Sequence, residues 1–75
     1  MFDKKNLSER VLSLRKVEGI TQSDLASAVG LNRTAVTLIE KGERAASIEV
    51  LCALADYFDV SLDYLVGRSD NQDRR

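Results

Sequence analysis

Apolar residues recur along this chain at intervals of three and four positions, and no segment alternates strictly between apolar and polar residues. The first spacing places apolar side chains on one face of a helix, whereas strict alternation would indicate a strand. Each of the four glycines ends an apolar-periodic segment: Gly19, Gly30, Gly42 and Gly67. A glycine just past the last turn is typical of a helix end. The pattern therefore predicts an all-α chain without strands.

Five helices follow from these segments, with expected ranges of about 7–18, 22–29, 33–41, 48–58 and 62–66. Ser47 and Ser61 are expected to cap the last two helices. The inner face of the fourth helix is predicted to hold Ile48, Leu51, Leu54, Ala55 and Phe58, with Cys52 as a small buried neighbour. Residues 1–67 should form one folded domain, and the polar tail 68–75, RSDNQDRR, is expected to be flexible.

The segment TQSDLASAVGLNRTAVTLIEKG, which begins at Thr21, predicts two short helices joined by a tight turn. Thr21 and Asp24 have the spacing of a capping box, and Asn32 can cap the second helix. Gly30 stands where the first helix ends, and the small Ala26 permits two crossing helices to approach closely. Such a pair can brace one helix on the DNA backbone while the next lies in the major groove.

Composition narrows the classes of function. The chain has 75 residues, of which 44% are apolar and 31% charged, and this is typical of a single small globular domain. It contains no histidine and one cysteine, so we expect no metal site, no cofactor and no enzymatic activity. No small-molecule ligand is indicated either.

No apolar run approaches the roughly 20 residues that span a bilayer, and the N-terminus lacks the apolar stretch of a secretory signal. With a single cysteine, which cannot form an internal disulfide, these features predict a cytoplasmic protein that does not contact a membrane.

The net charge is only −1, but the charges are unevenly distributed. Residues 1–44 contain eight basic and six acidic residues, whereas residues 45–75 contain three and six. A basic face is therefore expected on the half that holds the paired short helices, with an acidic half behind it.

The segments GITQSDLASAVGLNRTAVTLIEKGER and SIEVLCALADYFDVSLDYLVG resemble the phage repressor and Cro-type (XRE-like) helix-turn-helix family. The resemblance covers about residues 7–67. It implies a compact five-helix, repressor-like DNA-binding domain in which the second and third helices form the helix-turn-helix. Double-stranded DNA is the implied partner.

The resemblance also implies roles for individual residues. Arg15 and Glu40 match a pair that ties the first helix to the third. Phosphate contacts fall on Gln22, Lys41 and Arg44, and base contacts fall on Asn32, Arg33, Thr34, Thr37 and Leu38. Arginine at position 33 can donate two hydrogen bonds to a guanine.

Two residues depart from the family pattern. Members commonly carry a polar or basic residue where this chain has Leu38, and Glu43 places a negative charge near the expected DNA backbone. Leucine cannot hydrogen-bond a base, so Leu38 either contacts a thymine methyl group or takes no part in recognition.

The fourth helix carries a second apolar stripe, formed by Val50, Ala53 and Tyr57, and Tyr64 follows on the fifth helix. Contiguous apolar surface of this kind marks interfaces, so these four residues are predicted to form a homodimer contact.

The sequence thus predicts a transcriptional regulator, acting as a repressor, that binds a palindromic operator as a homodimer. The alternative is an antitoxin or anti-regulator of the same fold that acts mainly on a protein partner. The low basic charge and Leu38 favour that alternative.

Overall fold

The computed structural model describes residues 4–73, which form five helices and, within that range, no strand. The helices are α1 (Lys4–Glu18), α2 (Gln22–Val29), α3 (Arg33–Glu40), α4 (Ile48–Phe58) and α5 (Leu62–Leu65). The predicted all-α fold is confirmed. Helix α1 begins at Lys4, earlier than the expected residue 7, and α3 and α5 each end one residue earlier than expected.

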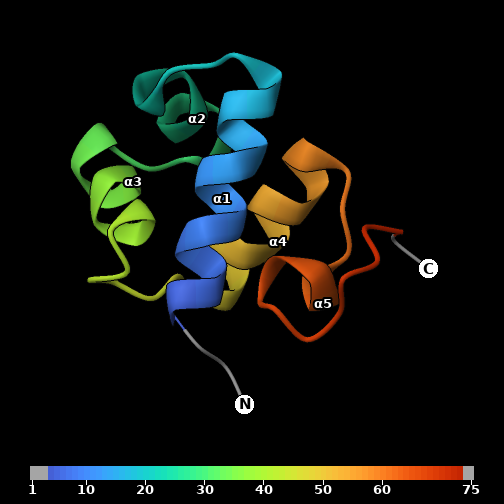
Figure 1. Cartoon of the computed structure of the whole chain (residues 1–75). Helices are drawn as coiled ribbons and strands as arrows, with labels where there is room; N and C mark the ends of the chain where they lie inside the picture. Colours follow the sequence, from blue (N-terminus) through green and yellow to red (C-terminus); the bar gives the residue numbers. More distant parts are fainter. Residues whose placement is uncertain (1–3, 74–75) are drawn as a thin grey trace.

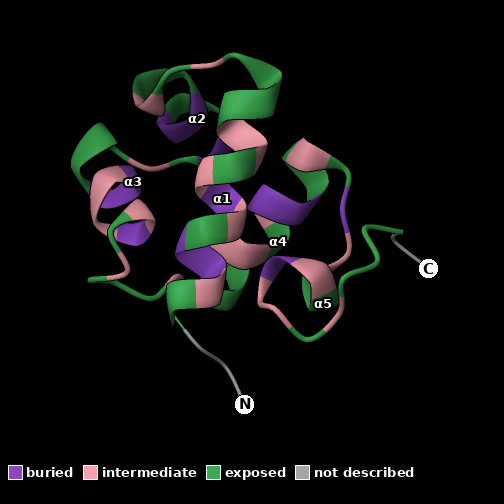
Figure 2. Cartoon of the chain, in the orientation of Figure 1, coloured by how far each residue is buried: buried purple, intermediate pink, exposed green. Residues whose placement is uncertain are grey.

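Helix α1 runs through the middle of the molecule, with α2 and α3 on one side and α4 and α5 on the other (Figure 1). It packs against α3 and α5, while α2 packs against both α3 and α4. This arrangement leaves the outer side of α3 facing solvent, because its neighbours lie on its inner side (Figure 2).

The ends of α2 and α3 follow from local hydrogen bonds. The Asp24 N–H donates to Thr21 Oγ1 at 3.0 Å, and the Thr21 N–H donates to the Asp24 carboxylate at 3.1 Å, which completes the predicted capping box. Gly30 ends α2 with φ of 76°, a left-handed conformation that costs glycine little. Asn32 Oδ1 then accepts from the Ala35 N–H at 2.8 Å and starts α3. The predicted turn between the two helices is confirmed.

A single core holds the five helices together, and each helix contributes buried apolar side chains to it. Its largest fully buried members come from α1, α2, α3, α4, the turn before α5, and α5. They are Leu7, Val11, Leu25, Val36, Leu54, Val60 and Leu65. Burying a leucine or valine contributes roughly 1.5–3 kcal/mol, so this core is the main source of stability.

Two burial predictions for α4 were wrong. Ile48 is 64% exposed because it is the first residue of the helix, at the edge of the bundle. Cys52 is also exposed. It lies two positions before the buried Leu54, a rotation of about 200° around the helix, so its side chain points away from the core.

The described part of the tail lies along α5. The Ser61 N–H donates to the Gln72 carbonyl at 3.0 Å, and Gln72 Nε2 donates to Tyr64 Oη at 3.2 Å. Arg10 lies 4.0 Å from the centre of the Tyr64 ring and pairs with Asp70 at 2.9 Å. The flexibility of the tail stays a prediction, and its last two residues, 74 and 75, lie outside the described range.

Among the helices of residues 4–73, none has both the length and the apolar character needed to cross a membrane. The same residues contain no group of three or more histidine, cysteine, aspartate or glutamate side chains placed to hold a metal ion.

Candidate nucleic-acid interface

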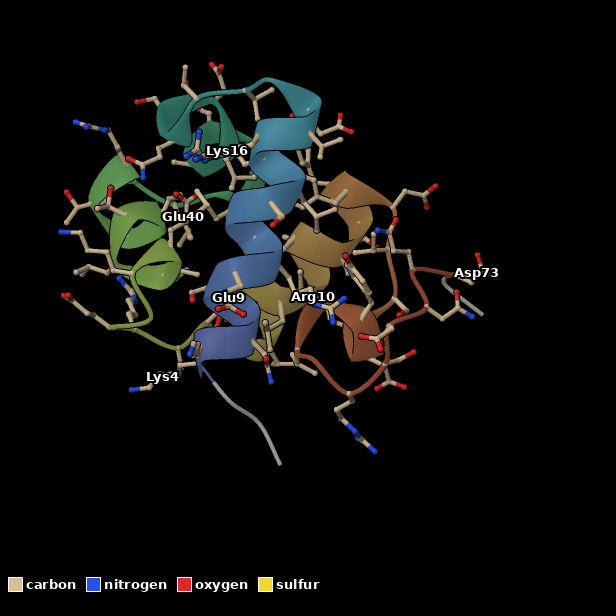
Figure 3. All side chains as sticks on the ribbon, viewed as in Figure 1. Lys4, Glu9, Arg10, Lys16, Glu40 and Asp73 are labelled. Atoms are coloured by element: carbon tan, nitrogen blue, oxygen red, sulfur yellow. The ribbon has the colours of Figure 1, made fainter. Side chains whose placement is uncertain are left out.

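Arg15 and Glu40 join α1 to α3 through a bidentate ion pair. Arg15 Nε donates to Glu40 Oε2 at 2.7 Å, and Nη2 donates to Oε1 at 3.2 Å. Their side chains are only 15% and 5% exposed, and Figure 3 shows Glu40 on the side of α3 that faces α1. The hydrogen bonds to Glu40 raise the pKa of Arg15 above its ordinary value. Arg15 also donates to the Ile20 carbonyl at 2.9 Å, so it fixes the end of α1 as well.

Gln22 extends this pair into a network that includes α2. Its Nε2 donates to Glu40 Oε1 at 3.0 Å, and its Oε1 accepts from the Thr37 hydroxyl at 2.9 Å. The structure therefore places the half-buried Gln22 side chain between α2 and α3, where it braces α3. One N–H of the amide is used for Glu40, and the second is available to a DNA phosphate.

The five residues predicted to contact bases lie on the outer side of α3 or at its N-terminus. Asn32, Arg33 and Thr34 are exposed, and Thr37 and Leu38 are half-buried. The opposite side of α3 consists of Ala35, Val36 and Ile39, each at most 3% exposed. Asn32 Oδ1 accepts the capping hydrogen bond, so the amide nitrogen is the part of this side chain that the cap leaves unused.

Basic residues follow directly on the C-terminus of α3. Lys41 is its C-cap residue, and both Lys41 and Arg44 are exposed in the loop that leads to α4. Glu43 is exposed in the same loop. The loop therefore offers two cations and one carboxylate beside the end of the helix.

Lys4 lies next to this loop, although nothing in the sequence pattern assigned it a role. A Cβ atom built on Gly42 would lie 4.0 Å from the Lys4 carbonyl oxygen and 3.6 Å from Ser8 Oγ, so the first turn of α1 packs beside the loop. The exposed Lys4 side chain extends from that end of α1 (Figure 3). In the sequence, the presence of two lysines before Leu7 was the only indication of a basic group here. The position of Lys4 beside Gly42 depends on the tertiary fold.

The four residues predicted to form the dimer contact are not equally accessible. Val50, Ala53 and Tyr64 are half-buried and pack against the core, while Tyr57 is 42% exposed. Leu62, on the neighbouring α5, is 38% exposed. The exposed large apolar side chains on the described α4 and α5 are thus Ile48, Tyr57 and Leu62, and the use of this surface in a dimer stays a prediction.

A family model described as helix-turn-helix matches residues 11–65, which span α2 and α3 and most of the remaining helices. The chain belongs to this helix-turn-helix family, of the phage repressor and Cro type. Its sequence-based assignment to that family is confirmed.

Two curated relatives and one solved structure illustrate the similarity. YqaE, an uncharacterized HTH-type transcriptional regulator of Bacillus subtilis, is 35% identical over 65 residues, covering 87% of this chain and 56% of YqaE. The cryptic phage CTXphi transcriptional repressor RstR of Vibrio cholerae is 34% identical over 62 residues, covering 83% of this chain and 55% of RstR. The chain thus spans just over half the length of these two relatives.

The P22 c2 repressor in complex with a synthetic operator is similar in structure, with a TM-score of 0.80 and 32% identity. The similarity covers 84% of this chain and 96% of the repressor chain. Nearly the whole of that chain therefore has a counterpart here, including the helix-turn-helix.

Proposed function

We propose that this helix-turn-helix protein is a cytoplasmic, sequence-specific DNA-binding transcriptional regulator that acts as a repressor. The observation that carries the proposal is the fixed orientation of α3. Side-chain hydrogen bonds among Arg15, Glu40, Gln22 and Thr37 hold α3 against α1 and α2. Arg33 and Thr34 face solvent on its outer side. A helix held in this way can enter the major groove without losing its side-chain geometry.

The residues around α3 divide into base-reading and backbone-binding groups. In this proposal Arg33 donates to the O6 and N7 atoms of a guanine, and Thr34 contacts the neighbouring base pair. Lys41 and Arg44 bind phosphates beyond the C-terminus of α3 in this proposal, and the second amide hydrogen of Gln22 donates to another phosphate from α2. This division resembles the expected pattern for a regulator whose phosphate contacts set orientation while base contacts select the sequence.

The number of cations near α3 is small, and this favours binding as a homodimer. Each phosphate contact adds to affinity through counterion release, so a monomer with few basic residues binds weakly. Two copies on a palindromic operator, with half-sites about one helical turn apart, would double these contacts. The apolar surface around Tyr57 is our candidate for the dimer contact.

A protein-interaction role remains a second candidate, but it is weaker. It rests mainly on the low basic charge, because the apolar Leu38 is also compatible with contact to a thymine methyl group. The named relatives YqaE and RstR are a transcriptional regulator and a transcriptional repressor.

Selection of bound sequences from a random duplex pool, at about 150 mM salt, tests the proposal. An enriched palindrome would support a dimeric regulator and identify its operator. Enrichment of one isolated half-site would support DNA recognition without the dimer. No enrichment by the folded protein would overturn the proposal, and Arg33→Ala should relax the preference at one base position of the operator that wild type selects.

A further inference from the structure

The hydroxyl hydrogen of Thr37 is already used inside the protein. Thr37 Oγ1 lies 2.9 Å from Gln22 Oε1 and 3.0 Å from the Arg33 carbonyl oxygen, and both of these atoms are acceptors. A hydroxyl has one hydrogen to donate, so either contact occupies it. Thr37 therefore has no donor left for the O6 or N7 atom of a base. What remains for contact is its hydroxyl oxygen, as an acceptor only, and its γ-methyl group.

Leu38 lies beside Thr37 and has no evident role in the core. It is half-buried, yet it is not among the partly buried side chains of residues 4–73 that pack against the core cluster. Thr34 precedes Thr37 by three positions and Leu38 by four, so the three side chains are neighbours on one surface of α3. That surface carries methyl groups, and the cationic Arg33 immediately precedes its first residue, Thr34, in the sequence.

We propose that Thr37 and Leu38 read the 5-methyl groups of thymines in the operator, next to the base pair that Arg33 reads. The inference rests on the proposed function and specifies its ligand: a half-site with thymine at one or two defined positions. The thymine C5-methyl is the one apolar group that unmodified bases present in the major groove. A protein surface made of a leucine side chain and a threonine methyl group matches the thymine methyl group, because neither the protein surface nor the base methyl needs a hydrogen-bond partner.

The DNA side of the test removes single methyl groups. Deoxyuridine replaces thymidine at one position at a time in the selected operator, which deletes the 5-methyl group and leaves base pairing intact. We expect a loss of about fourfold in affinity, the equivalent of one buried methyl group, at one or two positions of each half-site. Unchanged affinity at every position would overturn the inference.

The protein side compares two substitutions of nearly equal size. Thr37→Val keeps methyl groups and removes the hydroxyl, whereas Thr37→Ser keeps the hydroxyl and removes the methyl. We expect Thr37→Val to retain the sensitivity to deoxyuridine and Thr37→Ser to lose it at one position. The reverse result would show that the hydroxyl accepts a hydrogen bond from adenine or cytosine, and it would overturn the inference.

Leu38→Ala provides the second variant. Its affinity for the unmodified operator should fall by about the amount that deoxyuridine costs wild type, and deoxyuridine should then cost nothing further at the position that Leu38 contacts. Additive losses would contradict contact between Leu38 and that methyl group. Thermal unfolding followed by circular dichroism shows whether each variant is folded.

The two proposals fail in different ways. If wild type enriches no sequence from the random pool, the regulatory function itself is wrong. If it enriches an operator but ignores the loss of thymine methyl groups, only the assignment of Thr37 and Leu38 is wrong.

Discussion

Gln22 and Glu40 are joined by a hydrogen bond of 3.0 Å that links the two helices of the helix-turn-helix. Glu40 holds Arg15 with the same carboxylate, and Gln22 holds Thr37 with the other end of its amide. Four side chains from α1, α2 and α3 therefore form one connected network. Disturbing one member is expected to affect the position of α3, not only the stability of the domain.

The first prediction concerns the stability of this network. Glu40→Ala leaves the guanidinium of Arg15 and the amide of Gln22 without their shared acceptor in a largely buried site. We expect it to lower the free energy of unfolding by about 3–5 kcal/mol, measured by urea denaturation. Asp70→Ala is the matched control, since it removes a carboxylate that pairs with Arg10 but is fully exposed. Equal effects of the two substitutions would contradict a structural role for the Arg15–Glu40 pair.

The second prediction separates two roles of Gln22. If its main role is to brace α3, Gln22→Ala should weaken binding to the operator more than binding to random DNA, because the base-reading side chains lose their orientation. Equal weakening on both DNAs would indicate a phosphate contact instead. Fluorescence anisotropy with both duplexes at one salt concentration measures the difference.

The third prediction contrasts Arg33 with Lys41. Arg33→Ala should cost about 1–3 kcal/mol on the operator and relax the preference at one base position. Lys41→Ala should weaken binding to all sequences alike. Repeating the selection from a random pool with each variant gives the base preferences directly, and an unchanged preference in Arg33→Ala would rule out its role as a base reader.

The fourth prediction concerns Lys4, which the fold places beside the loop after α3. If Lys4 binds a phosphate there, Lys4→Gln should reduce the slope of log affinity against log salt by about 0.9. Arg68→Gln makes the same change in net charge at an exposed position after α5, and it should leave the slope unchanged. A similar slope for both variants would mean that Lys4 acts only through overall charge.

The fifth prediction concerns the turn after α5. Gly67 has φ of 84°, and a Cβ atom there would lie 2.5 Å from the Cβ of Asn6. Gly19 has a similar φ of 70° but nothing within 4 Å of such an atom. Both substitutions to alanine carry the cost of a left-handed residue, about 1–2 kcal/mol. Gly67→Ala should cost about 1–3 kcal/mol more, because α5 and α1 must separate. Equal unfolding free energies for the two variants would show that the turn adapts freely.

The number of helices and most of their ends could be predicted from the sequence because the forces involved are local. The hydrogen bonds that cap α2, α3, α4 and α5 each join residues three positions apart, at Thr21, Asn32, Ser47 and Ser61. The spacing of apolar residues likewise depends only on the geometry of a single helix. The Arg15–Glu40 pair was expected only through the family resemblance, since 25 positions separate its members.

Other features depended on how the helices pack. The sequence placed Ile48 and Cys52 on the inner side of α4, but burial depends on where neighbouring helices end and which face they cover. The position of Lys4 beside Gly42, and the use of the Thr37 hydroxyl by Gln22, arise from contacts between segments that are distant in the chain. Local sequence determined the helices and their caps because those interactions span one turn. The tertiary structure alone decided which polar atoms remain available to DNA, because those atoms are occupied or left free by contacts between different helices.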